Sequence, residues 1–92
     1  MSAGPPAALV LLSAPGCHLC HALRAVVERV LPDFALALSE RDVREDPQLR
    51  ARYALDIPVL LLEGRELLRH RASEDELRAA LRAAGVEPRA RS

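Results

Sequence analysis

The chain has 92 residues, half of them hydrophobic and 28% charged, which suits one small water-soluble domain with one modest core. Thirteen basic side chains balance thirteen acidic ones, and both signs are spread along the sequence. Because no basic stripe is available to attract phosphates, we expect no nucleic-acid partner.

The apolar segments are too short to cross a membrane. Uninterrupted apolar runs such as Ala7–Leu12 and Val59–Leu62 fall far short of the ~20 residues that a spanning helix needs. The N-terminus has no basic residues, and Pro5 and Pro6 interrupt its apolar stretch, unlike a signal peptide. We therefore expect a cytoplasmic protein without membrane contact. In that reducing compartment, two cysteines are more often reactive or metal-binding than structural.

The first predicted elements are a buried strand and an amphipathic helix. Ala7–Leu12 is a continuous apolar run bounded by turn residues, which is typical of a strand buried on both faces, as in a parallel sheet. After Gly16 the apolar period becomes helical, and Pro32 ends the helix. The helical stripe comprises Leu19, Leu23, Val26, Val27 and Val30. The start of Phe34–Val43 alternates and predicts a second strand.

The second half predicts a helix, a hairpin and a last helix. Asp46-Pro47 is a helix start, since Asp caps free N–H groups and Pro suits the first helical position, and this helix should run to about Ala54. Val59–Leu62 predicts a strand that returns antiparallel, after the turn at Glu63-Gly64, as Glu66–Arg69.

The last helix has clear boundaries. Ser73 and Glu76 form the sequence of a capping box, and the apolar period continues through Leu77, Ala80, Leu81 and Ala84 to Gly85. The order is therefore β-α-β-α-β-β-α, in which the first unit needs a parallel strand pair. We predict an α/β fold: a four-stranded mixed sheet with three flanking helices. The whole chain, 1–92, should form one domain with its core at about 7–84 and loose termini at 1–6 and 86–92.

Both cysteines lie in one Cys-x-x-Cys motif, Cys17-His18-Leu19-Cys20, where a strand turns into a helix. Positions i and i+3 of a helical turn lie on one side, so the two sulfurs can bond. Unpaired N–H groups at the helix start stabilise a thiolate, which is the nucleophile in disulfide exchange. The motif therefore predicts Cys17 as the nucleophile and Cys20 as the resolving thiol.

Other chemistries use the same residues. Cys17–His21 matches the attachment signature of c-type haem, but Met1 is the only methionine and no export signal precedes the motif. For a zinc site, the sequence has no second Cys/His pair at the usual distance from Cys17 and Cys20, so no metal site within one chain is expected. A non-catalytic module that binds a partner, or that shares a metal or iron–sulfur cluster between two chains through Cys17, stays open.

The histidines of the motif are ambiguous. An imidazole at His18 would help to hold the thiolate of Cys17, but an exposed first-turn histidine without a role fits the sequence equally well. His21 is expected to face solvent one turn later. His18 is therefore a candidate modulator only.

Taken together, Ala7–Leu12, the Cys17–Cys20 motif, the stretch Tyr53–Leu62 and the helix Ser73–Ala84 resemble the thioredoxin fold, and most closely a small glutaredoxin-like protein of a divergent bacterial type. The resemblance covers about Ala7 to Ala84. It implies a thioredoxin-like fold and a thiol–disulfide oxidoreductase that acts on protein or small-molecule disulfides. It also implies a monomer that requires no cofactor, with glutathione as a candidate co-substrate.

The resemblance further implies that Pro58 is cis and packs beside the cysteines, where the backbone of Ile57 would pair with an extended substrate. The chain differs from glutaredoxins before its last helix, where Arg71-Ala72-Ser73-Glu74 replaces the glycine-glycine-acidic turn that normally helps to bind glutathione. We therefore expect weak use of glutathione.

Overall fold

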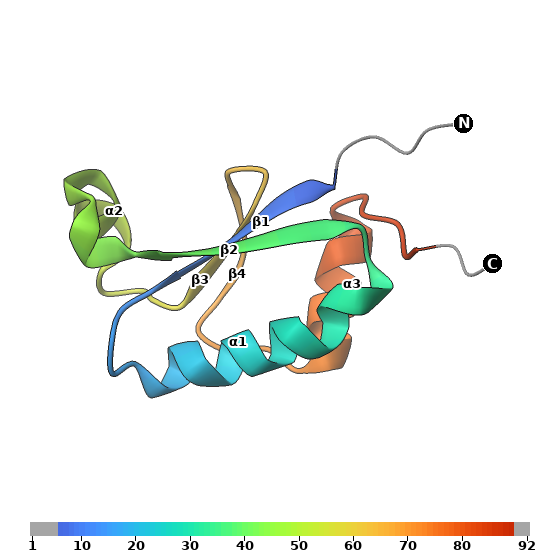
Figure 1. Cartoon of the computed structure of the whole chain (residues 1–92), viewed down its shortest axis with the longest axis horizontal. Coiled ribbons are helices and arrows are strands. Elements are labelled where there is room, and N and C mark those ends of the chain that lie inside the picture. Colours follow the sequence, from blue (N-terminus) through green and yellow to red (C-terminus); the bar gives the residue numbers. More distant parts are fainter. Residues whose placement is uncertain (1–5, 90–92) are drawn as a thin grey trace.

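The computed structural model describes residues 6–89. Four strands form one mixed sheet in the order β2-β1-β3-β4, as Figure 1 shows. Their bounds are β1 Ala7–Ser13, β2 Leu36–Asp42, β3 Val59–Leu62 and β4 Arg65–Arg69. The three α-helices are α1 His18–Val30, α2 Pro47–Tyr53 and α3 Glu74–Ala83. The predicted α/β fold and its element order are confirmed.

The pairing of the strands makes the sheet mixed. β1 and β2 are parallel over their whole length, from Ala7 opposite Leu36 to Ser13 opposite Asp42, and α1 is the crossover between them. β3 runs antiparallel to β1, with Val59 opposite Leu12, and β4 returns antiparallel to β3. The strand β1, which the apolar run Ala7–Leu12 predicted, is thus a central strand.

Side chains from β1 enter two separate cores because the helices cover both faces of the sheet. Leu9 and Leu11 belong to the larger core, which α1 and α3 share with β2 and β3. Leu12 belongs to the smaller core, where Tyr53 of α2 packs with Val43. In Figure 1, α1 and α3 lie on one side of the sheet and α2 lies toward the other. This arrangement explains why β1 is apolar at consecutive positions rather than at alternate ones.

Helix α1 packs with a slightly different face from the predicted one. The buried residues are Cys20, Leu23, Val27 and Val30, spaced three and four apart. Leu19 was expected in this stripe but is 40% exposed, because Cys20 occupies the inward position of the first turn. The buried face of the helix therefore includes one of the two cysteines.

The second strand starts later than predicted. Pro32 lies in a 3₁₀ turn, Leu31–Asp33, that follows α1 directly, and regular pairing with β1 begins at Leu36. Phe34 is buried in the larger core and forms an isolated bridge with Pro88.

The C-terminal segment from Val86, which we expected to be loose, makes several hydrogen bonds as far as Arg89. The amide of Val86 donates to the carbonyl of Leu81 at 2.9 Å, and the amide of Arg89 donates to the carbonyl of Asp33 at 2.7 Å. The remaining residues of the two expected loose termini, 1–5 and 90–92, lie outside the described part of the chain.

Both predicted helix starts are confirmed in detail. The Asp46 carboxylate accepts hydrogen bonds from the amides of Gln48 and Leu49. At α3, the Ser73 hydroxyl accepts from the Glu76 amide at 3.1 Å, while the Glu76 carboxylate accepts from the Ser73 amide at 2.8 Å. Over residues 6–89, the structure contains no helix with the length and apolar character needed to cross a membrane.

The central position of β1 predicts the cost of truncating it. Leu11 is fully buried, so Leu11→Ala should lower the free energy of unfolding by about 2–5 kcal/mol, through lost burial and the cavity left behind. Leu55→Ala is a matched control at a side chain that is 97% exposed, and it should cost less than about 0.5 kcal/mol. Urea unfolding measures both values. Equal effects of the two variants would contradict the described packing of β1.

Candidate active site

The Cys-x-x-Cys motif lies immediately beyond the end of β1. Ser13 ends the strand, and a turn closed by the Cys17 amide donating to the Ala14 carbonyl at 3.3 Å leads into α1. Gly16 has a φ of +77°, a left-handed conformation that side chains rarely adopt. Cys17 follows as the N-cap residue of α1. The central strand and this turn together fix the position of the first sulfur.

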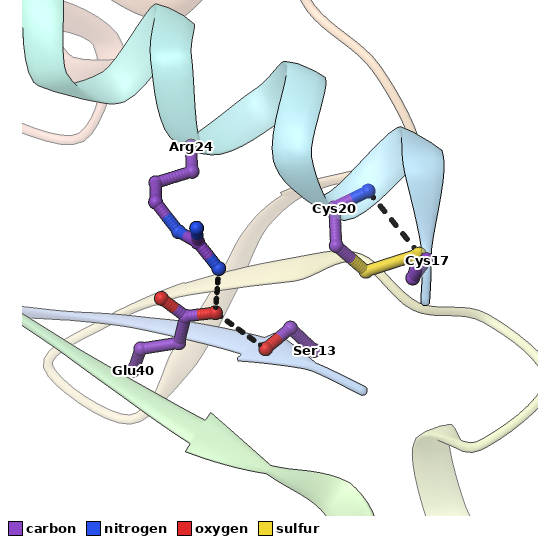
Figure 2. Close-up of a disulfide and its surroundings, with 5 residues drawn as sticks. All are labelled: Ser13, Cys17, Cys20, Arg24 and Glu40. Carbon is purple, nitrogen blue, oxygen red and sulfur yellow. Dashed lines mark hydrogen bonds and ion pairs between the residues drawn. A yellow bond between two sulfur atoms is a disulfide. The ribbon is translucent and has the colours of Figure 1, made fainter. Parts of the chain in front are cut away.

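Cys17 and Cys20 are joined by a disulfide, with their Cα atoms 5.2 Å apart. The amide of Cys20, which has no partner within the helix backbone, donates to the Cys17 sulfur at 3.2 Å, as Figure 2 shows. Cys17 is half-buried, whereas Cys20 is only 1% exposed. The two sulfurs therefore differ in access, and the reachable one also accepts a hydrogen bond from the helix start.

The Ile57-Pro58 bond is cis, as the resemblance implied. The segment directly precedes β3, whose first residue, Val59, pairs with Leu12 near the end of β1. Ile57-Pro58 thus lies at the end of the sheet from which the chain continues to Cys17. Pro58 is buried, and its carbonyl accepts the amide of His70 at 2.7 Å. A contact of the Ile57 backbone with substrate stays a prediction.

Both histidines of the motif region are exposed on α1. His18 lies in the first turn beside Cys17, and its role as a modulator stays a prediction. Within residues 6–89, no group of three or more His, Cys, Asp or Glu side chains gathers in a way that could hold a metal ion.

A polar cluster that the sequence analysis did not identify lies beside the disulfide, formed by Ser13, Arg24 and Glu40. The Ser13 hydroxyl donates to Glu40 Oε2 at 2.7 Å, and Arg24 Nη2 donates to the same oxygen at 2.5 Å. Ser13 is only 6% exposed, and Glu40 is on the neighbouring strand β2. Figure 2 shows Arg24 reaching down from the turn of α1 that follows Cys20.

The cluster holds two opposite charges. The hydrogen bond from Arg24 is the main reason that the pKa of Glu40 lies below its usual range, and the Ser13 hydroxyl lowers it further, whereas burial opposes both. The Glu40 carboxylate in turn raises the pKa of Arg24. Near neutral pH the pair is therefore a carboxylate and a guanidinium, fixed between α1 and the sheet.

Two sequence signals point to this cluster in retrospect. Glu40 continues the alternation of Leu36 and Leu38, so a carboxylate stands in the row of side chains that faces α1. Arg24 follows Cys20 by four residues, which places both on one side of the helix. Only the register between β1 and β2 shows that Ser13 and Glu40 meet, because they are 27 residues apart in the sequence.

A family model described as "Glutaredoxin-like domain (DUF836)" matches residues 8–82. The chain belongs to this glutaredoxin-like family. The match includes the Cys-x-x-Cys motif, the cis-proline segment and most of α3. Among curated proteins, none matches the sequence.

Solved structures are similar to most of the chain. The glutaredoxin-like domain is similar to the target protein XcR50 from X. campestris, with 32% identity and a TM-score of 0.69, covering 82% of this chain and 96% of that one. It is also similar to protein Ne2328 from Nitrosomonas europaea, with 25% identity and a TM-score of 0.72, covering 86% and 95%.

A mutant thioredoxin from Halobacterium salinarum NRC-1 has the same fold, with 22% identity and a TM-score of 0.58, covering 83% of this chain and 73% of that one. The predicted thioredoxin-like fold is therefore confirmed.

The lowered pKa of Glu40 predicts a pH dependence of stability for the glutaredoxin-like domain. A carboxyl whose folded-state pKa is depressed stabilises the fold above its unfolded value, which is about 4.5. That stabilisation should disappear as the pH falls through the lower folded-state value. Urea unfolding should therefore show wild type more stable than Glu40→Gln by a constant margin between about pH 5 and 7, and by a shrinking margin below that.

Arg24→Gln provides the control, because it removes the main cause of the depression. In the Arg24→Gln protein, adding Glu40→Gln should lower the free energy of unfolding at neutral pH by less than it does in wild type. A margin between wild type and Glu40→Gln that stays constant to about pH 3 would contradict the described ion pair.

Proposed function

We propose that this glutaredoxin-like domain is a thiol–disulfide oxidoreductase, with Cys17 as the nucleophile and Cys20 as the resolving thiol. The observation that carries the proposal is the bonded pair at the start of α1, in which one sulfur is reachable and the other is buried. A helix N-terminus favours the thiolate of Cys17 in the reduced state, because the unpaired N–H groups and the dipole stabilise negative charge there.

The exchange proceeds in two balanced steps. The Cys17 thiolate attacks one sulfur of a substrate disulfide, whose S–S bond breaks, and the other sulfur leaves with the electron pair and takes a proton from solvent. Cys20 then loses its proton, and its thiolate attacks the Cys17 sulfur of the mixed disulfide. The second substrate thiolate leaves and is protonated in turn. Two electrons and two protons pass to the substrate, and two thiols of an external reductant restore the dithiol.

Features around the cysteines favour an extended substrate, such as the disulfide of a protein or peptide. The Ile57 backbone precedes β3 at the same end of the sheet as Cys17, and would pair with such a segment. Leu19 in the first turn of α1 and Leu55 in the loop before Ile57 are exposed, so apolar side chains flank this end of the molecule. Small-molecule disulfides would use the same cysteines without these contacts.

The remaining parts of the proposal follow from the same chemistry. His18 is exposed directly after Cys17, where a protonated imidazole would add to the stabilisation of the thiolate. Reversible exchange at this pair suits a reducing compartment, so we propose that the protein acts in the cytoplasm as a monomer. We propose no cofactor and no nucleic-acid or membrane partner.

Alkylation and trapping test the roles of the two cysteines. In the reduced protein at neutral pH, a thiol reagent should label Cys17 at least about tenfold faster than Cys20, because Cys17 is reachable and its thiolate is stabilised. Cys20→Ser should accumulate a mixed disulfide between Cys17 and the substrate, detected by mass spectrometry, whereas Cys17→Ser should not. Faster labelling of Cys20 would exclude Cys17 as the nucleophile. A visible absorbance band or stoichiometric metal in the purified protein would favour the non-catalytic alternative.

The start of α3 predicts poor use of glutathione. Two backbone donors there are already involved in the capping box of Ser73 and Glu76, and Glu74 and Asp75 add negative charge to the same turn. An anionic tripeptide should be repelled, so turnover with glutathione and a low-molecular-weight disulfide should be about tenfold below that of an ordinary dithiol glutaredoxin, equivalent to about 1.4 kcal/mol.

The variant Asp75→Asn tests the charge argument directly. It should raise the rate of disulfide reduction with glutathione as the reductant. The rate with dithiothreitol, an uncharged reductant, should not change. Wild-type turnover with glutathione equal to that of an ordinary dithiol glutaredoxin would show that the acidic turn does not matter.

A further inference from the structure

The ion pair between Arg24 and Glu40 lies next to the buried cysteine, on the same side of α1. Cys20 and Arg24 are four residues apart, a spacing that brings side chains of a helix within about 5–6 Å of each other at their Cβ atoms. Figure 2 shows both side chains directed from α1 toward the sheet, with Ser13 and Glu40 below them. The charge nearest to Cys20 along its own helix face is thus a guanidinium.

The ion pair with Glu40 holds this guanidinium in place and reduces its field. Glu40 Oε2 accepts from both Arg24 Nη2 and Ser13 Oγ, so the carboxylate is itself anchored to the end of β1. Glu40 does not satisfy every donor of the guanidinium. Arg24 Nε is buried and has no hydrogen-bond partner among residues 6–89. One donor of the guanidinium is therefore unpaired among the described residues.

We propose that Arg24 and Glu40 are positioning residues that set the thiolate stability of Cys20 in opposite directions. Arg24 favours the thiolate by its positive charge, and Glu40 limits this effect by pairing with the guanidinium and drawing it to the sheet. Ser13 acts through Glu40, whose orientation it fixes. The inference rests on the proposed function, since the thiolate of Cys20 is the group that attacks the mixed disulfide.

The resolving step requires a Cys20 thiolate that is neither too unstable nor too stable. Burial disfavours the charged form of a thiol, so an isolated Cys20 with 1% exposure would ionise reluctantly and resolve the mixed disulfide slowly. A neighbouring cation offsets this cost, but too strong a cation would stabilise the reduced form and resist closure of the disulfide. A cation that is paired with a carboxylate stabilises the thiolate to an intermediate degree.

The role of Glu40 is electrostatic rather than that of a proton acceptor. The hydrogen bonds from Arg24 and Ser13 lower its pKa, which makes the carboxylate a weak base. In the resolving step, the proton of Cys20 passes to solvent, its thiolate forms the S–S bond with Cys17, and the substrate sulfur leaves with the electron pair.

Single-cysteine proteins measure the effect on Cys20 without exchange. In a Cys17→Ser background, the ultraviolet absorbance of the thiolate gives the pKa of Cys20 as the pH is varied. Glu40→Gln should lower this pKa, and Arg24→Gln should raise it, each by about 0.5–1 unit, or about three- to tenfold in the ionisation constant. The double variant should return close to the starting value, and Arg24→Lys, which keeps the charge, should stay within about 0.3 unit of it.

The control is a second ion pair of the same helix. Arg29 and Glu74 join α1 to α3 at 2.6 Å, so Arg29→Gln and Glu74→Gln make the same charge changes farther along α1 from the cysteine pair. They should leave the pKa of Cys20 within about 0.2 unit, because exposed charges are screened over such separations. Since His18 and His21 also lie on α1, the series is repeated with both changed to Gln.

The same variants, with both cysteines restored, are equilibrated with mixtures of reduced and oxidised glutathione at a pH at least one unit above the wild-type pKa of Cys20, where this residue is mostly thiolate in the reduced protein. Glu40→Gln should shift the equilibrium toward the dithiol and Arg24→Gln toward the disulfide, each by about three- to tenfold. If both folded variants shift this equilibrium in the same direction, or neither shifts it, the inference is overturned. A cluster with a purely structural role has no reason to shift the equilibrium in opposite directions.

Two further outcomes are distinguishable. A wild-type protein that forms no reversible Cys17–Cys20 disulfide would contradict the proposed function itself, whatever the variants do. If Glu40→Gln or Arg24→Gln fails to fold, Ser13→Ala decides the matter with both charges retained. Loss of its hydrogen bond should move the pKa of Cys20 in the same direction as Glu40→Gln, and an unchanged value would overturn the inference.

Discussion

Burial of β1 on both faces is the constraint on which the rest of the structure depends. Leu9 and Leu11 pack under α1 and α3, while Leu12 packs toward α2, so the strand can occupy only a central place in the sheet. Neighbours on both sides then provide its hydrogen bonds, β2 in parallel and β3 in antiparallel orientation. Because the next residues begin the turn to Cys17, the buried central strand of the sheet also supports the reactive pair.

The two cysteines belong to different environments although only two residues separate them. Cys17 caps α1 and meets the N–H groups of its first turn, whereas Cys20 is part of the apolar stripe that continues with Leu23 and Val27. One structural element therefore places one sulfur at the surface and the other in the core. The same helix carries Arg24 to the sheet, where it pairs with the Glu40 carboxylate of β2, which also accepts a hydrogen bond from the last hydroxyl of β1.

Local sequence patterns predicted most of the elements because each one has its own signal. The capping box of Ser73, the Asp46-Pro47 start and the turn at Glu63-Gly64 depend on neighbours within a few residues, and all three agree with the structure. The differences arise where distant segments compete for a residue. Leu19 gives up the inward position to Cys20, Phe34 pairs with Pro88 rather than with β1, and Val86 is held by the end of α3.

By itself, the sequence determined the α/β class, the order of the elements, and a Cys-x-x-Cys pair at the start of a helix. These properties follow from periodicity, capping and spacing, which act over a few residues. Tertiary structure alone decided the strand order, the antiparallel pairing of β1 with β3, and the meeting of Ser13, Arg24 and Glu40. The physical reason is that strand register joins residues far apart in the chain, and no local pattern records which polar side chains will face each other across it.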